Sequence, residues 1–579
     1  MQRSEFSKKE KLQKSFRNGP KARSLVAQHL EWRGSLHRMG MGNGRRHSPA
    51  RPLLLRVCGG SLFFAISAYI LFFRGKGVNA SSAPSGRRCA LDSYDASATT
   101  ELDLKDCSLE RLPPSILRFT SLVKLDVSKN AALQDLPPLP PTLRTIFALG
   151  GGFESIPRSV AALPSLRMLS FKSCRLRDVG DAPLPTSLEW LILTDNHLTA
   201  LPAAIGSLVR MRKLMLANNR LSALPASMGA MSELELLRVA NNRLESIPPW
   251  LLALPKLTWL AIAGNPCVAP APARAALPAV QYKELALGAR LGEGTSSVVR
   301  KGEWRAQTIA VKVYKARLSS DGQNLDEVRA SCAVDHPNVL RWLGYVEEGA
   351  REEGAREEAR ASSAGSGWRL VGLLEWSPGF TSLGKPPSMD SVTRDTYPPS
   401  ARFGGAEIRD IARGICAALQ HLHSRSLAHG DLYAHNILWR RNGGAAAADT
   451  KGGHARRGGA DGGGAVAKLS DFGAAFYYGG ASTTADGVHY ERFEQRAFGF
   501  LLEELLERHD GTEPRLLPHV RAAATAATAT VADDRPGFSA LLEILAGGAS
   551  GGLKGRKLLR PRSRFGRVLP DGHPLKDKE

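Results

Sequence analysis

Leucine and other apolar residues recur through the first half of the chain with a period close to 23 residues. The pattern L-x-x-L-x-L-x-x-N/C-x-L surrounds each repeat, as in "LEWLILTDNHL" and "MRKLMLANNRL". A spacing of 23 residues separates Asn196, Asn219, Asn242 and Asn265. This period predicts an α/β leucine-rich-repeat solenoid in which each repeat contributes one short strand. We expect the solenoid to cover residues 99–267.

The turn position of the repeats carries Asn or Cys, except for Gly151. Such a side chain is expected to point inward and to bond backbone groups where the chain bends. This accounts for Cys107 and Cys174 without redox chemistry. The seven cysteines form no C-x-x-C pair and no His cluster accompanies them, so we expect neither a disulfide framework nor a zinc site.

Alternate positions along each predicted strand should face away from the leucine core. The apolar members of this outward row include Trp190, Ile192, Met215 and Trp259. An exposed apolar row usually marks a partner surface. We therefore predict that a protein substrate or regulator binds the concave repeat face. The alternative is that the row packs against the chain's own neighbouring domain.

A Pro/Ala-rich linker at 268–284 is followed by a glycine-containing segment and, further along, by a lysine. "LGEGTSSVV" permits a hairpin that approaches phosphates closely, and Lys312 in "AVKVYK" supplies a fixed positive charge. "WRLVGLLEW" predicts a strand that leads into a hinge, with Leu374 at its end. The predicted ATP-binding residues are Leu291, Gly292, Glu293, Gly294, Val299, Ala310, Lys312, Glu375 and Trp376.

Three further polar motifs accompany the lysine. Glu327 in "NLDEVRASC" is the candidate carboxylate that orients Lys312, with Asp326 as the fallback. "AHGDLYAHNILW" contains Asp431 and Asn436, and "KLSDFGAAF" contains Asp471.

Together these motifs resemble the protein kinase superfamily over about residues 287–545. The resemblance implies a two-lobed α+β domain, placed at 285–547, with ATP and Mg²⁺ as cofactors. It implies that Lys312, Glu327 and Asp431 are catalytic, with Asp431 accepting the proton of the substrate hydroxyl. Asn436 and Asp471 are the implied metal ligands.

Several positions depart from the kinase pattern. Gly430 stands where the pattern has Arg, and Tyr433 stands where many kinases have Lys. The segment after D-F-G is short and lacks A-P-E, so Glu491 is the best substitute partner for Arg535. Glu494 stands where the buried helix D-x-W-x-x-G has Asp. The phrases "HGDLYAHNIL", "LSDFGAA" and "RAFGFLLEELL" resemble leucine-rich-repeat serine/threonine kinases of bacteria and algae.

The predicted function is transfer of the ATP γ-phosphate to Ser/Thr hydroxyls of a protein that the repeats recruit. All five polar groups that the kinase pattern requires are present, which favours an active enzyme. One alternative is a nucleotide-binding pseudokinase scaffold at a membrane. Another is a membrane-docked adaptor in which basic tails dominate.

Charge lies mainly at the two ends of the 579-residue chain, whose net charge is +23. Residues 1–51 carry +10 and the last thirty residues carry +6. We expect disordered basic tails at 1–51 and 548–579. Acidic lipid headgroups are the alternative partner. Nucleic acid is disfavoured because aromatic residues are not regularly interleaved.

One uncharged apolar run of 17 residues, "VCGGSLFFAISAYILFF", lies between Arg56 and Arg74. It predicts a single transmembrane or signal-anchor helix at 52–74, followed by a linker at 75–98. A buried helix and a cleaved signal are the alternatives. The upstream Lys/Arg excess would place the kinase domain on the lumenal side, whereas its need for ATP favours the cytosol. An Arg-rich organelle-targeting extension would resolve this conflict.

Overall fold

The computed structural model describes the repeats and the kinase-like domain as a series of residue ranges separated by gaps. The described residues are 89–269, 280–294, 296–348, 369–442, 464–479 and 484–547, with backbone only at 484–489. The predicted tails and the predicted membrane segment at 52–74 lie outside these ranges and stay predictions. Within the described part of the chain, no helix is long and apolar enough to cross a membrane.

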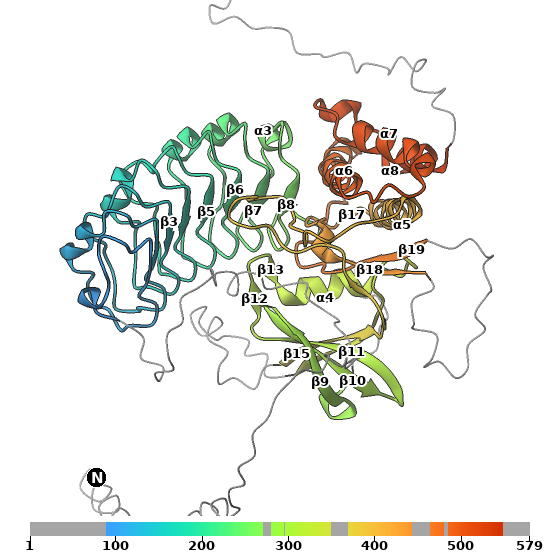
Figure 1. Ribbon diagram of the computed structural model, residues 1–579, viewed down its shortest axis with the longest axis horizontal. Helices are drawn as coiled ribbons and strands as arrows, with labels where there is room; N and C mark the ends of the chain where they lie inside the picture. Colours follow the sequence, from blue (N-terminus) through green and yellow to red (C-terminus); the bar gives the residue numbers. More distant parts are fainter. Residues whose placement is uncertain are drawn as a thin grey trace, which may run out of the picture. The chain divides into compact units, whose positions relative to one another are not determined.

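The repeats form one parallel sheet whose strands lie side by side, with short helical turns along the opposite face (Figure 1). Each strand has three residues because each repeat turns as soon as its leucines are buried. The strands are β1 (Glu101–Asp103), β2 (Lys124–Asp126), β3 (Thr145–Phe147), β4 (Met168–Ser170), β5 (Trp190–Ile192), β6 (Lys213–Met215), β7 (Leu236–Arg238) and β8 (Trp259–Ala261). The turns are η4 (Pro114–Arg118), η5 (Arg158–Ala162), η6 (Ala203–Ser207), η7 (Ala226–Ala230) and α3 (Pro249–Leu252).

A ladder of buried asparagines fixes the repeat period. The Asn219 amide donates to the carbonyls of Leu193 and Leu216, each at 2.9 Å, and its oxygen accepts the Leu198 N–H at 3.1 Å. Equivalent bonds recur in the neighbouring repeats. Buried backbone groups without partners would be costly, so each Asn stabilises the bend between two repeats. The leucine-rich-repeat prediction is confirmed.

The cysteines of the repeats behave in two ways. Cys174 takes the inward position expected of it, with its Sγ atom 3.0 Å from the Ala148 oxygen, and burial raises the pKa of its thiol to about 11. Cys107 instead forms a disulfide with Cys89, so the expectation of no disulfide is wrong for this pair. Residues 89–98, predicted as linker, contain η3 (Leu91–Ser93), whose buried Leu91 covers the end of the leucine core. End repeats need such a cap.

The N-terminal lobe of the second domain, called the upper lobe here, is an antiparallel sheet with one helix. Its strand order is β14-β15-β11-β10-β9, and a small β12–β13 hairpin precedes helix α4. The elements are η8 (Tyr282–Glu284), β9 (Ala286–Glu293), β10 (Ser297–Trp304), β11 (Gln307–Tyr314), β12 (Leu318–Ser319), β13 (Gly322–Gln323), α4 (Asn324–Cys332), β14 (Trp342–Glu348) and β15 (Arg369–Glu375).

The lower lobe is mainly helical (Figure 1), and its central helix α5 buries the apolar face that the sequence predicts, including Ile408, Ile411 and Ile415. The helices are α5 (Gly405–His423), η10 (Ala434–Asn436), α6 (Thr484–Glu507), η11 (Pro514–Leu516), α7 (Pro518–Ala527), η12 (Ala532–Asp534) and α8 (Phe538–Ala546). The strands are β16 (Thr381–Ser382), β17 (Leu427–Ala428), β18 (Ile437–Arg441), β19 (Ala465–Leu469) and β20 (Phe476–Tyr477).

The outward row of the repeat sheet is covered by the lower lobe. Trp190, Ile192, Met215 and Trp259 are 4%, 7%, 8% and 3% exposed, and they belong to the same hydrophobic cluster as α5 and α6. The prediction that this row is an exposed partner surface is therefore wrong, and the alternative of packing against the neighbouring domain holds. The repeat pattern shows which positions leave the leucine core, but it does not show what covers them.

Trp259 is the central aromatic residue of this interface. Its ring stacks on Tyr433 with centroids 4.5 Å apart and an interplanar angle of 5°. Its indole N–H donates to the Leu432 carbonyl at 2.9 Å. Nearby, Thr393 donates to Glu235 at 2.5 Å, and Arg394 lies 3.2 Å from the same carboxylate. The repeats and the lower lobe thus share a packed core with paired polar groups.

Replacement of this tryptophan tests the buried interface. We expect Trp259→Ala to reduce the free energy of unfolding by about 3 to 5 kcal/mol, because it leaves a cavity and removes the stacking partner of Tyr433. The measurement is urea denaturation. Trp250→Ala is the matched control, since Trp250 lies half-buried on α3, away from the interface. Equal, small losses for both variants would contradict the buried interface.

Candidate active site

Buried charges from three elements meet between the two lobes. Lys312 lies on β11 and Glu327 on α4, and the lysine Nζ atom is 2.5 Å from Glu327 Oε1. The same Nζ atom lies 3.6 Å from Asp471 Oδ1. Burial favours the neutral amine, but the carboxylates of Asp471 and Glu327 outweigh burial and raise the pKa of Lys312. The lysine is held charged and in a fixed position, as phosphate binding requires.

A cleft that is mostly apolar lies beside these charges. Val299 and Ala310 come from the upper sheet, and Leu438 comes from β18 of the lower lobe. The lining residues are Val299, Ala310, Lys312, Glu327, Leu340, Trp342, Leu374, Glu375, Asn436, Leu438, Ser470 and Asp471. An apolar cleft with charged groups at one side suits a purine base joined to phosphates.

Sequence reasoning missed four residues that line this cleft: Leu340, Trp342, Leu438 and Ser470. Two of them stand beside recognised motifs, since Leu438 follows Asn436 by two positions and Ser470 directly precedes Asp471. Trp342 packs over Gly372 of the neighbouring strand, where a Cβ atom would lie 2.4 Å from its ring. No local sequence signal reveals that contact, because it depends on strand register.

Five of the predicted ATP-binding residues lie outside the cleft lining: Leu291, Gly292, Glu293, Gly294 and Trp376. Gly292 pairs in register with Val299, and the Gly294 N–H donates to the Ser297 carbonyl at 2.7 Å, which closes the hairpin. The Glu293 carboxylate points to Lys315, at 2.6 Å. The hairpin thus borders the cleft through Val299.

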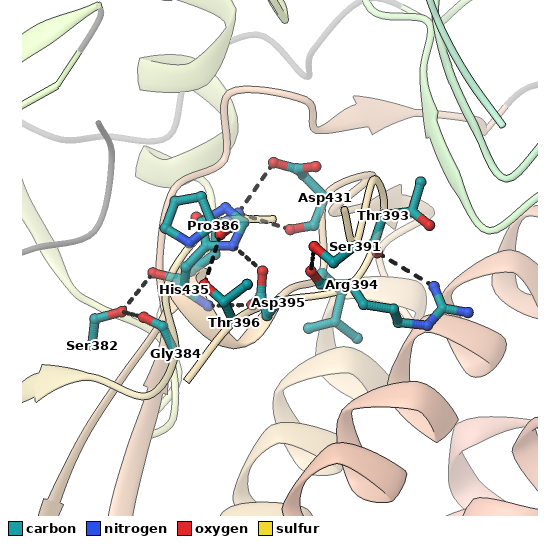
Figure 2. Close-up of polar contacts among 12 residues, drawn as sticks. Ser382, Gly384, Pro386, Ser391, Thr393, Arg394, Asp395, Thr396, Asp431 and His435 are labelled. Atoms are coloured by element: carbon teal, nitrogen blue, oxygen red, sulfur yellow. Dashed lines mark hydrogen bonds and ion pairs between the residues drawn. The ribbon is translucent and has the colours of Figure 1, made fainter. Parts of the chain in front are cut away.

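The catalytic-loop candidates face one another. The Asn436 amide donates to the Asp431 carbonyl at 2.8 Å and to its Oδ2 atom at 3.2 Å. His429 braces the loop, with its Nε2 atom 3.1 Å from the Ser470 carbonyl. His435 is buried, and its Nδ1 atom lies 2.7 Å from Asp395. Figure 2 shows His435, on the same loop as Asp431, beside Asp395.

Arg238 reaches Asp431 from the repeats. Its Nη2 atom lies 2.7 Å from Asp431 Oδ1. Burial would raise the pKa of this carboxyl, but the Arg238 guanidinium, together with His435 and His429, holds that pKa below its ordinary value. The carboxylate therefore stays ionised and able to accept a proton at neutral pH. Nothing in the sequence links a residue of β7 to a loop 193 positions later.

Helix α6 anchors the catalytic loop through the carboxylate of Glu494. The Gly430 N–H donates to Glu494 Oε1 at 2.5 Å, and His423 Nε2 lies 2.7 Å from Oε2 of the same carboxylate. Glu494 thus occupies the structural role expected of the buried-helix Asp. Glu491 does not pair with Arg535 as expected. It accepts the Phe538 N–H at 2.9 Å, while Arg535 donates to the carbonyls of Ala529 and Arg492.

The metal-ligand candidates fit magnesium in a nucleotide complex. Asp471 offers a carboxylate, and Asn436 offers an amide beside Asp431. In the described ranges no group of three or more His, Cys, Asp or Glu side chains could hold a metal unaided. Mg²⁺ ordinarily takes one or two carboxylates and completes its shell with phosphate oxygens and water. The residues present therefore suit a metal that arrives with ATP.

Comparison with known proteins agrees with this geometry. Residues 285–493 match the protein kinase domain family, and residues 209–266 match a leucine rich repeat family. A probable serine/threonine-protein kinase of Dictyostelium discoideum is 35% identical over 65 residues, which is 10% of this chain and 7% of the relative. A second from that organism is 25% identical over 167 residues, 28% of this chain and 10% of the relative.

Activated Cdc42 kinase Ack of Drosophila melanogaster is 39% identical over 77 residues, covering 12% of this chain and 7% of that protein. The matched stretches thus span a tenth or less of these relatives. The cleft and its fold define a protein kinase domain, and the solenoid defines leucine-rich repeats. The chain therefore contains a protein kinase domain preceded by leucine-rich repeats.

Gly430 offers a test of how closely the repeats approach the loop. Its φ is +75°, and an added Cβ would lie 2.5 Å from the Ala474 oxygen and 2.7 Å from the Leu260 oxygen. Gly511 has a φ of +90° with no atom within 4 Å of such a Cβ. We expect Gly511→Ala to reduce stability by about 1 to 2 kcal/mol through backbone strain alone, and Gly430→Ala to reduce it clearly more. Thermal unfolding measures both, and equal losses would contradict the close approach.

Proposed function

We propose that the protein is an ATP-dependent protein kinase that phosphorylates Ser or Thr hydroxyls of a protein acceptor. The observation that carries this proposal is the convergence of five polar groups at one cleft, four of which line it while the fifth, Asp431, is bonded to Asn436 of the lining. Lys312 is paired with Glu327 and lies near Asp471, and Asn436 is bonded to Asp431. A cluster of ion pairs that only stabilised the fold would not need these five residues together. Phosphoryl transfer uses each of the five.

Each group has a part in the transfer step. Lys312 is placed to bind the α- and β-phosphates, and Glu327 keeps it there. Asp431 accepts the proton of the acceptor hydroxyl while the hydroxyl oxygen bonds to the γ-phosphorus and the bond to the β-phosphate oxygen breaks, releasing ADP. A magnesium ion held by Asp471 and Asn436 would neutralise phosphate charge. The ion pair of Asp431 with Arg238 keeps the carboxylate ionised before the hydroxyl arrives.

Serine and threonine acceptors are favoured by the two Dictyostelium relatives, whose names describe probable serine/threonine-protein kinases. A pseudokinase scaffold is the rival function. It is disfavoured because none of the five groups is replaced and because Lys312 already has its Glu327 partner. Recruitment of the acceptor by the row around Trp190 and Trp259 is not part of this proposal, since the lower lobe covers that row.

Two substitutions separate transfer from nucleotide binding. We expect Asp431→Asn to reduce kcat by about 10²- to 10⁴-fold, because it removes the base, while ATP affinity stays near that of the wild type. Lys312→Met should weaken ATP binding as well as transfer, because it removes the charge that faces the phosphates. Incorporation of labelled γ-phosphate into casein measures transfer, and calorimetric titration with magnesium and a non-hydrolysable ATP analogue measures binding.

Asp335→Asn is the control for this pair, since Asp335 is exposed on the upper lobe. It should leave transfer and binding unchanged. Nucleotide binding by a wild-type protein that labels neither casein nor itself would identify a pseudokinase instead.

A further inference from the structure

The catalytic loop lacks two features that usually surround its Asp. Gly430 and Tyr433 occupy the positions where Arg and Lys are common, so the loop itself brings neither cation next to Asp431. Only ten residues, 474–483, join Gly473 to the start of α6. An arginine or lysine beside Asp431 must therefore come from another part of the chain.

The last repeats pack directly against the catalytic loop. The Leu260 carbonyl lies against Gly430, at the position closed to any side chain there. Ala474, which follows the D-F-G motif, is buried in a small cluster with Ala217, Ala240 and Ala261 of three successive repeats. Trp259 is bonded to the Leu432 carbonyl. Small side chains on both surfaces thus let the repeat sheet lie directly on the catalytic loop.

Arg238 is the residue of that sheet that reaches the base. Its side chain is 12% exposed, and its guanidinium pairs with Asp431 and with Asp321 of the β12–β13 hairpin that precedes α4. Asp431 therefore has one oxygen on Arg238 and the other on the Asn436 amide. The planar guanidinium fork can hold two carboxylates on separate N–H groups in a fixed geometry.

We propose that Arg238 is a positioning residue for phosphoryl transfer, and that the repeats complete the active site by supplying this cation to Asp431. Arg238 orients the carboxylate toward the acceptor hydroxyl and connects it to the upper lobe through Asp321. The repeats would then be a fixed part of the catalytic unit. This inference rests on the proposed kinase function, because it assigns a partner to the base of that reaction.

Two observations favour this role over a lock that blocks the site. The interface is a continuous hydrophobic core with buried polar pairs such as Thr393–Glu235, which is typical of permanent contacts. The glycine and alanines that admit the repeats are built into the loop itself. A reversible lid would leave Gly430 and Ala474 facing water whenever it opened, with no side chains to cover the exposed backbone.

Arg238 also differs from the other cation near the base. Lys213 of the preceding repeat is buried over the Trp190 ring at 4.2 Å, and burial lowers the pKa of its amine to about 7. The charge of Arg238 contributes to this lowered pKa, and Lys213 is therefore only partly charged at neutral pH. An arginine keeps its charge at every physiological pH. The charged groups around Asp431 are Arg238, Lys213, His429 and His435, with the carboxylates of Asp321 and Asp395 beyond them.

The test replaces the charge and keeps the shape. We expect Arg238→Met to reduce kcat by about 10- to 100-fold, the effect of losing a charge-assisted hydrogen bond to the reacting group. ATP affinity and KM for ATP should change little. Arg238→Lys should recover part of the lost kcat.

Arg212→Met is the matched control, because Arg212 lies one repeat earlier in the same interface and pairs with Glu235 and Thr393 instead of Asp431. It should keep a kcat near that of the wild type. If Arg238→Met does not fold, as judged by circular dichroism and ATP binding, Arg238→Gln replaces it with a neutral donor and the same outcomes apply.

The outcomes distinguish failure of the proposed kinase function from failure of the positioning role of Arg238. A wild-type protein that transfers no phosphate to casein or to itself would overturn the proposed function. With an active wild type, an unchanged kcat in the Arg238 variant would overturn only the positioning role. An increased kcat would also overturn it and would show that the repeats inhibit the kinase. Equal losses in the Arg238 and Arg212 variants would reduce the effect to general loosening of the interface.

Discussion

A close approach of the two domains at Gly430 determines much of what surrounds it. The Leu260 and Ala474 carbonyls leave no room for a side chain there, and the Gly430 N–H is held by Glu494. Because the backbone is fixed from above and below, Asp431 has little freedom to move. The absence of the usual arginine is therefore not simply a loss of regulation. It is the steric condition under which the repeats can reach the base.

Buried polar groups fix how the repeats are placed on the lower lobe. Apolar residues such as Trp259 and Met215 supply area to the interface, but area alone tolerates sliding of one surface over the other. Hydrogen bonds such as Thr393 to Glu235 do not, because a shifted register would leave a buried carboxylate without its donor. The asparagine ladder acts in the same way inside the solenoid. One set of bonds fixes the shape of the solenoid and the other fixes its position on the lower lobe.

The sequence predicts those parts of the structure that depend on local pattern. The 23-residue period defines the repeats, and the motifs around Lys312 and Asp431 define the kinase domain, since each rests on residues a few positions apart. The burial of Trp190, the disulfide of Cys107 and the role of Arg238 depend on contacts between distant segments. An outward-facing arginine on β7 has the same local pattern whether it meets solvent or Asp431. Only the packing of the two domains distinguishes these cases.

If the repeats form part of the active site, then binding of a molecule to the repeats also affects the geometry of Asp431. If Arg238 and Asn436 together orient Asp431, then the free energy of repeat packing is linked to the geometry of the base. Linkage is reciprocal, so a ligand that favours the closed cleft stabilises the repeat contact, and a partner that distorts the last repeats weakens catalysis. No conventional activation loop is needed for such coupling, and the short segment after Gly473 leaves little length for one. On the proposed function, this coupling would pass through β7 and β8, because these strands carry Arg238 and Trp259, which touch the catalytic loop.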